Sequence, residues 1–499
     1  MDMVFPLLST IIFLPLAVAF VLILLPRKNP IVIKVFTLIW TILEFGLSLP
    51  LFFNFNEKTA GMQFMENLDW FPEFGIGYIL GVDGISMLLV LLTTFLTVLC
   101  VLCSWNSITD KVKEYYASFL LLETAMLGAL CALDLVLFYI FWELMLVPMY
   151  LLIGVWGGPR RIYAAIKFFL FTMVGSVLML LAIMALYFHY GRDTGIYTFN
   201  LLELYKANIP VMKQYWLFAA FALSFAIKVP MFPFHTWLPD AHTEAPTAGS
   251  VILAGVLLKM GTYGFLRFAI PLFPQAALAA APIISILALI GIIYGAIMCI
   301  MQTDLKRLIA YSSVSHLGYV MLGIFAFNMQ GLEGGIYQML NHGVSTGGLF
   351  LIVGMIYERR HTRMIADFGG LSKVMPRLAV FFMIITLSSI ALPGTNGFVG
   401  EFLILLGVFR SNISYGVLAA SGVILGAVYM LWMFQRVMFG QITKEENRGL
   451  KDITKRETVI LCAIVFFIFF MGLYSQAFFR KMDATAAGYL QNMQTKIAS

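Results

Sequence analysis

The chain has 499 residues, of which 61% are apolar and only 12% are charged. Because a soluble domain carries about 25% charged residues, this composition excludes a soluble enzyme and indicates a chain that lies almost wholly in lipid. The formal net charge of +6 is spread over short loops, so we expect no nucleic-acid binding. The sequence has no nucleotide, haem or iron–sulfur motif, so we also expect no cofactor and no metal bound by this chain.

Fourteen stretches are long and apolar enough for a crossing helix, which needs about 20 residues. They predict an all-α polytopic membrane protein of about 14 transmembrane helices. The acidic stretch 54–83 predicts an outer loop with a short hairpin. In chain order, the predicted segments are 5–25, 32–53, 82–104, 115–132, 135–154, 162–188, 213–232, 247–268, 278–300, 307–327, 332–357, 377–409, 413–438 and 458–478.

Basic residues are unevenly divided between the two sets of loops. One set carries 20 of the 32 Lys and Arg residues, among them Arg27 and Lys28, and the other set carries nine. Short loops rich in Lys and Arg stay on the cytoplasmic side of a membrane. We therefore expect both termini of the chain on the outer side.

Ionisable side chains interrupt the apolar segments. A charge inside the bilayer costs about 2.5–3.5 kcal/mol or more, so each needs a reason. Several lie near segment midpoints, which favours a lateral row that passes protons over a vertical pore. The alternative is that they are buried ion pairs or helix contacts, and Lys167, near a cytoplasmic end, can snorkel. The candidate proton-transfer residues are Glu123, Glu143, Lys228, Lys259, His316, His342 and Glu401.

Two segments carry helix breaks beside these charges. Two prolines follow Lys228 in "KVPMFPF", and "LPGTNG" precedes Glu401. Irregular backbone at membrane depth is tolerated within protein or around a water-filled cavity, and matching breaks indicate an inverted-repeat transporter. We expect helices seven and twelve to be broken, and helices four to eight and nine to thirteen to form two inverted repeats. The predicted divisions are 1–114 with the outer loop, 115–268, 278–438 and 439–499 with helix fourteen and an outer tail.

The repeat offset pairs Glu143 with His316, and Lys228 with Glu401. Within the first repeat, Glu143 is the natural charge partner of Lys228. The link "HTWLPDAHTEAPT" between helices seven and eight is read as a polar cytoplasmic loop. Its His and acidic residues match no zinc spacing, and a metal site, a proton-entry rim and a structured loop all stay open. Lys306 and the arginine after it are read as a cytoplasmic anchor.

Five stretches carry a family resemblance, which spans roughly residues 80–440. The chain resembles the antiporter-like proton-pumping subunits of respiratory complex I, the NADH-quinone oxidoreductase. These stretches are "FWELMLVPMYLLIGVWGG", "KVPMFPFHTWLPDAHTEAPT", "LLKMGTYG", "DLKRLIAYSSVSHLGYV" and "LPGTNGFVGEF".

The resemblance implies a role for each candidate. Glu143 takes the place of the family's fifth-helix glutamate and Lys228 that of its partner lysine. Lys259 matches the central eighth-helix lysine, and Glu401 matches the twelfth-helix acid. Glu123 corresponds to a fourth-helix glutamate, and His316 and His342 match histidines of the central axis.

The resemblance also implies partners and chemistry. The chain would be a membrane-arm subunit without a redox centre, in a bacterial inner membrane, beside lipid and the sibling subunits L and N. FMN, iron–sulfur clusters, NADH and quinone would lie in other subunits. Glu401, where subunit L has lysine, and the lack of a long lateral C-terminal helix argue against subunit L. The alternatives are an Mrp-type cation/proton antiporter subunit and a non-pumping structural subunit.

Overall fold

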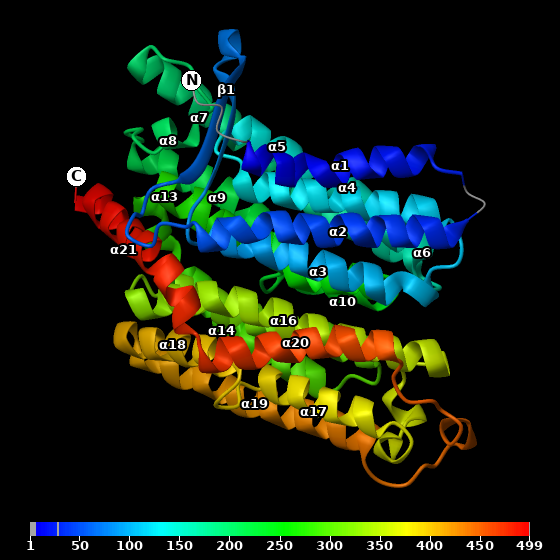
Figure 1. Cartoon of the computed structure of the whole chain (residues 1–499). Helices are drawn as coiled ribbons and strands as arrows, with labels where there is room; N and C mark the ends of the chain where they lie inside the picture. Colours follow the sequence, from blue (N-terminus) through cyan, green and yellow to red (C-terminus); the bar gives the residue numbers. More distant parts are fainter. Residues whose placement is uncertain (1–5, 27–28, 499) are drawn as a thin grey trace.

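Long helices lying side by side make up most of the molecule (Figure 1). The computed structural model describes residues 6–26 and 29–498. Arg27 and Lys28, which contribute to the predicted cytoplasmic charge, therefore lie outside the described residues, as do residues 1–5 and 499.

The first eight predicted segments all coincide with helices. The fifth is divided into α5 and α6, and the eighth contains two π-helical turns, η3 and η4. The elements are α1 (Leu7–Leu24), α2 (Pro30–Phe53), α3 (Ser86–Ser107), α4 (Val112–Cys131), α5 (Leu135–Leu144), α6 (Leu146–Trp156), α7 (Arg161–Thr194), α8 (Leu201–Leu204), α9 (Val211–Lys228), α10 (Trp237–Glu244), α11 (Thr247–Ile252), η3 (Leu253–Leu257), α12 (Leu258–Gly264), η4 (Phe265–Ala269) and α13 (Ile270–Leu272).

The last six predicted segments are helical as well, and the twelfth is divided into α17 and α18. The residues after the fourteenth segment, predicted only as a tail, form the further helix α21. The elements are α14 (Pro274–Ile300), α15 (Leu305–Ile324), α16 (Met329–Arg360), α17 (Pro376–Ser389), α18 (Asn396–Ser411), α19 (Ile413–Met438), α20 (Lys455–Leu473) and α21 (Gln476–Ala498).

Within the described residues, ten helical stretches are long and apolar enough to cross a membrane. The fourth, seventh, tenth and twelfth predicted segments are not among the ten. Each of those four segments carries one candidate residue, namely Glu123, Lys228, His316 and Glu401. The all-α polytopic fold is confirmed, and the count of fourteen crossings stays a prediction.

The predicted outer hairpin is present as strands β1 (Gln63–Phe71) and β2 (Ile76–Val82), which pair antiparallel. Glu66 on β1 accepts hydrogen bonds from the backbone nitrogens of Leu8 at 2.7 Å and Ser9 at 3.2 Å. A helix start leaves such N–H groups without partners inside the helix, and it favours a negative charge. The carboxylate therefore ties the hairpin to the start of α1.

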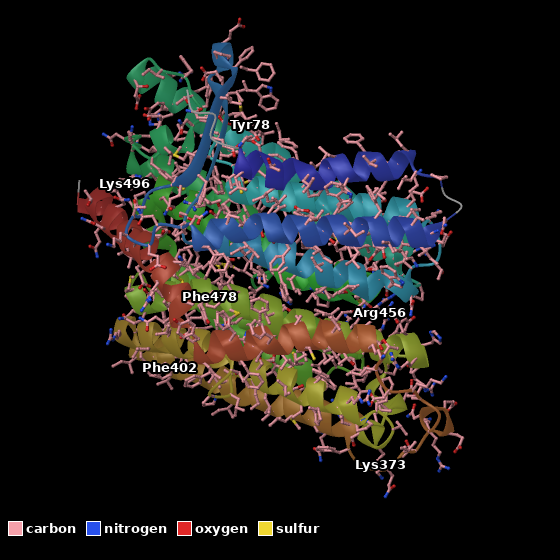
Figure 2. The ribbon with its side chains drawn as sticks, in the orientation of Figure 1. Tyr78, Lys373, Phe402, Arg456, Phe478 and Lys496 are labelled. Carbon is pink, nitrogen blue, oxygen red and sulfur yellow. The ribbon has the colours of Figure 1, made fainter. Side chains whose placement is uncertain are left out.

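The two ends of the bundle differ in what they carry. Strands β1 and β2 lie at one end with α8 and α21 (Figure 1), and Lys496 lies there too (Figure 2). Lys373 and Arg456 lie at the opposite end (Figure 2). The loop between α19 and α20 extends beyond the helices at that same end (Figure 1).

The predicted breaks are confirmed. Helix α9 ends at Lys228, and a turn through Pro230 and Pro233 leads to the next helix. Prolines supply no backbone donor and cannot continue the helix. In the second break the chain leaves α17 at Ser389 and turns through Gly394, whose φ of +91° favours glycine.

The segment read as a polar cytoplasmic loop is different from the prediction. Residues Trp237–Glu244 form the helix α10, and all eight of its residues are buried. Trp237 and Leu238 are fully buried, so the polar residues of the same helix also lie inside the bundle. There α10 packs against α7 and α15. The polar residues of this stretch predicted an exposed loop. They form a buried helix instead, because its charged side chains find partners inside the protein.

Candidate functional site

Lys259 lies in the eighth segment, directly after the π-helical turn η3. A π-helical turn shifts the backbone hydrogen-bond ladder, and such turns are frequent at functional sites. Lys259 donates from Nζ to the carbonyl oxygen of Ala254, within η3. The same nitrogen lies 2.6 Å from Nδ1 of His342 on α16. With 1% exposure of its side chain, Lys259 is held by one carbonyl and one imidazole.

Glu401 on α18 is the second centre of the buried row. Its Oε1 lies 2.9 Å from Nδ1 of His316 on α15 and accepts a hydrogen bond from Nε2 of Gln338 at 3.0 Å. Asn341 in turn donates to the Gln338 side-chain oxygen at 3.1 Å. The break between α17 and α18 places Glu401 in the second turn of α18, where it meets both neighbouring helices.

His316 and His342 join the two centres. Their ring centroids are 5.9 Å apart, and Nε2 of each ring has no hydrogen-bond partner. A cavity of about 10 Å³ is lined by both histidines and also by Asn341 and Ser389. Asn341 Oδ1 and Ser389 Oγ lack partners as well. One water needs a volume of about 10–15 Å³ and two to four polar partners, so this cavity fits one water molecule.

Lys228 and Glu143 do not form the expected ion pair. Lys228 Nζ has no hydrogen-bond partner and no carboxylate oxygen within 4.0 Å among the described residues. It lies 5.1 Å from the centroid of the Trp142 ring and 5.8 Å from that of Phe168. Glu143 sits in the last turn of α5, is half-buried, and still influences the lysine electrostatically.

Glu123 is separate from the row. It lies on α4, fully buried, and its neighbours are Thr97 on α3 and Glu44 on α2. Glu44 was missed because the second segment was read only for length and apolarity. A single acid in an apolar helix was the signal that would have found it.

At the end of the bundle that carries Lys373, buried α10 supplies further charged contacts. Lys167 Nζ lies 2.7 Å from Asp240 Oδ2, so Lys167 is ion-paired and does not snorkel to the surface. His242 stacks on Phe350 at 4.6 Å, and neither ring nitrogen has a partner.

Lys306, read from the sequence as a cytoplasmic anchor, is buried. It is 4% exposed and donates from Nζ to the carbonyl oxygen of Ala245 at 2.6 Å. The charged neighbours of His242 are Lys306 and Lys259. His242 is thus within electrostatic reach of both Lys306 and Lys259 of the buried row.

The hydroxyl groups beside His316 donate to backbone carbonyls. Ser312 and Ser313 donate to the carbonyl oxygen of Ile309, and Ser315 donates to that of Ile292 at 2.9 Å. Serines in helices often bond to such carbonyls. In the described part of the chain, no group of three or more His, Cys, Asp or Glu side chains has the arrangement of a metal site.

A polytopic bundle with two broken helices and a buried row of lysine, histidine and glutamate defines an antiporter-like membrane subunit. The sequence model of the family described as NADH:quinone oxidoreductase/Mrp antiporter matches residues 132–426. The model described as NADH-ubiquinone oxidoreductase chain 4, amino terminus, matches residues 7–133.

NADH-quinone oxidoreductase subunit M of Rhodobacter capsulatus is 48% identical, covering 99% of this chain and 98% of its own length. The chain belongs to the family of complex I subunit M, whose mitochondrial counterpart is chain 4. A chain of respiratory complex I from Thermus thermophilus matches with a TM-score of 0.89 and 33% identity, over 97% of this chain and 99% of that one. The predicted distinction from subunit L is thereby confirmed.

A chain of the Mrp complex from Dietzia has the same fold, with a TM-score of 0.85 over 98% of this chain and 99% of that chain. Its identity is 19%, so the likeness concerns the fold alone. The chain is thus a multi-pass membrane subunit of a respiratory enzyme complex.

Proposed function

We propose that this subunit moves protons from the cytoplasmic to the outer side of the membrane, driven by electron transfer elsewhere in complex I. The observation that carries the proposal is the buried sequence of contacts Lys259–His342–His316–Glu401. Each member both binds and releases protons, and each touches or nearly touches the next. Buried ionisable groups are costly in a membrane segment, and a row of four supports a transport role over helix contacts.

The proposed order of transfer begins near Lys228 and passes to Lys259. From Lys259 the proton moves to His342 through their direct contact. One water molecule in the cavity between the rings relays it to His316, and Glu401 receives it before release on the outer side. Fixed donors and acceptors suit this task because the geometry need not reorganise at each step.

Lys228 and Glu143 have a different role in this scheme. An amine without a close carboxylate is costly to charge in a buried site, and an approaching carboxylate makes the charge favourable. We propose that Glu143 moves toward and away from Lys228 during turnover. Glu143 is half-buried, which suits a group that can change its position.

The chain is proposed to contain two inverted repeats, residues 115–268 and 278–438. In this arrangement Glu143 and Lys228 of the first repeat correspond to His316 and Glu401 of the second. The second pair is in contact at 2.9 Å and the first is not. We infer that the two repeats are in different stages of the same proton-transfer cycle, one with its pair in contact and the other with its pair apart.

We further propose subunits L and N as the neighbours, and a bacterial inner membrane with both termini outside. The loop between α19 and α20 would then face the cytoplasm. FMN, iron–sulfur clusters, NADH and quinone would be bound by other subunits. The main alternative, an Mrp-type antiporter, is favoured only by the shared fold, whereas identity of 48% over the full length favours complex I.

Replacing Lys259 with alanine tests the proposal in the native host. We expect assembled complex at the normal level, with NADH-driven proton pumping per electron strongly reduced. Lys451→Ala, at an exposed loop position, is the matched control. Normal pumping in an assembled Lys259→Ala complex would instead support a non-pumping structural subunit.

A further inference from the structure

Helices α2, α3 and α4 enclose a polar stripe that the proposed proton route does not use. On α2 its members recur every three or four residues, which places them on one helix face. All members are buried. They are Thr37, Thr41, Glu44 and Ser48 on α2, Thr93, Thr94 and Thr97 on α3, and Glu123 on α4.

The two carboxyl groups of this stripe face each other. Glu44 is 1% exposed and Glu123 is 0% exposed, and the two carboxyl groups lie within electrostatic reach of each other. Both lie near the middle of their helices.

Three of the four side-chain oxygens of these two acids have no hydrogen-bond partner among the described residues. Glu44 Oε1 and both side-chain oxygens of Glu123 are without partners. The Thr97 hydroxyl is a neighbour of Glu123, but it donates to the carbonyl oxygen of Thr93 at 3.0 Å. Thr41 likewise donates to the Leu38 carbonyl at 3.1 Å.

Among the residues that the structure describes, the surrounding elements supply no compensating charge. Helix α1 carries no charged residue, and on α3 the titratable neighbour is Cys100, whose thiol donates to the Ala248 carbonyl at 3.6 Å. On α2, Lys34 donates to the Trp105 carbonyl at 2.6 Å, ten positions away from Glu44. Lys113 and Glu114 lie in the first turn of α4, and Glu123 lies in the middle of that helix.

Two negative charges cannot remain side by side in a buried site without a cation. A single proton resolves this conflict, because a protonated carboxyl is a donor and its neighbour is an acceptor. We infer that Glu44 and Glu123 bind one proton between them and serve as a second proton-loading site, between α2 of the N-terminal helices and α4 of the first repeat. This inference rests on the proposed proton translocation, and it adds a site apart from the row of Lys259, His342, His316 and Glu401.

The test uses the whole assembled complex and infrared difference spectroscopy across a pH change. Wild type should show the carbonyl band of a protonated carboxyl that loses its proton at high pH. Glu44→Gln and Glu123→Gln should each remove this band, with assembly intact and fewer protons pumped per electron. Glu44→Asp should retain a shifted band and part of the pumping. Glu445→Gln, which alters an exposed loop acid, is the control.

Two results would overturn the inference. The first is a wild-type band that persists in both glutamine variants, which would assign it to other carboxyls. The second is loss of the band with unchanged protons per electron, which would make the shared proton a structural one. Pumping in Lys259→Ala reports on the main route alone, so failure of the proposed function is distinguishable from failure of this site.

Discussion

Lys259 and His342 are 83 positions apart in the sequence, yet their side-chain nitrogens lie 2.6 Å apart inside the bundle. At this distance one nitrogen must donate and the other must accept. Either the ammonium gives its hydrogen to a neutral ring, or the ring N–H gives its hydrogen to a neutral amine. The two nitrogens therefore share one hydrogen that either group can bind. A proton-transfer step requires such a contact.

His342→Leu should interrupt the row at that contact. It removes the acceptor for Lys259 and one wall of the cavity that fits a water molecule. We expect normal assembly and a fall in pumping-coupled NADH:quinone turnover of about 10²-fold, the size of a lost proton-transfer group. NADH:quinone turnover and proton uptake, both measured in membrane vesicles, give the size of this fall.

His361→Leu is the matched control, since that histidine lies exposed beyond the end of α16. Equal losses in the two variants would contradict a specific role for His342.

Glu401→Gln should preserve shape while removing the titratable acid. The amide oxygen can still accept from Gln338, which now donates at 3.0 Å, so the packing of α18 should change little. We expect assembled complex with pumping reduced to the level of His342→Leu. Native gels and vesicle acidification give the two readouts, and an active Glu401→Gln complex would remove Glu401 from the route.

Lys228→Met tests the first break. The methionine stem keeps the apolar packing against Trp142 and Phe168, and it removes a buried amine that has no hydrogen-bond partner. Burying such a group is unfavourable, so thermal stability should be unchanged or slightly higher while turnover falls. Lys206→Met, at an exposed lysine paired with Glu203, is the control.

If Lys228→Met leaves turnover and protons per electron unchanged, the lysine is a structural feature of the break. The opposite result, lost turnover in a stable complex, makes it a coupling residue.

Asp83 and Arg267 form a buried ion pair of 2.6 Å at the end of the bundle that carries the hairpin. Removing one partner of such a pair leaves an uncompensated buried charge, at a cost of about 3–5 kcal/mol. Asp83→Asn should therefore lower the thermal dissociation temperature of the subunit in detergent. The double variant Asp83→Leu with Arg267→Met should recover most of this loss. An Asp83→Asn variant with an unchanged dissociation temperature would contradict the stabilising role of the pair.

The same pair predicts a pH dependence. Burial alone would raise the pKa of Asp83, but the Arg267 charge and the backbone donors of Ile85 and Ser86 outweigh it and lower the pKa. The folded-state pKa lies below the unfolded value of about 3.9, so this stabilisation is complete above about pH 5 and is lost as the pH falls through the folded value. Unfolding temperatures between pH 7 and 3 should fall less steeply in Asp83→Asn.

The amino-acid sequence by itself determined the fourteen apolar helical segments and the two breaks, but not the helices α10 and α21. Apolar length is a local property, and it marked all fourteen helical segments within a few residues. Proline chemistry is local too, so the end of α9 at Lys228 was predictable. The candidate residues were found because a charge in an apolar segment is conspicuous wherever its helix lies.

Only the tertiary structure decided which of these residues meet. Lys259 contacts His342, and Glu401 contacts His316, because α12, α15, α16 and α18 pack together. The separation of Lys228 from Glu143, the burial of α10 and the meeting of Glu44 with Glu123 likewise arise from helix packing. Side-chain distances across helices depend on how the faces interlock, and no spacing along one chain segment encodes them.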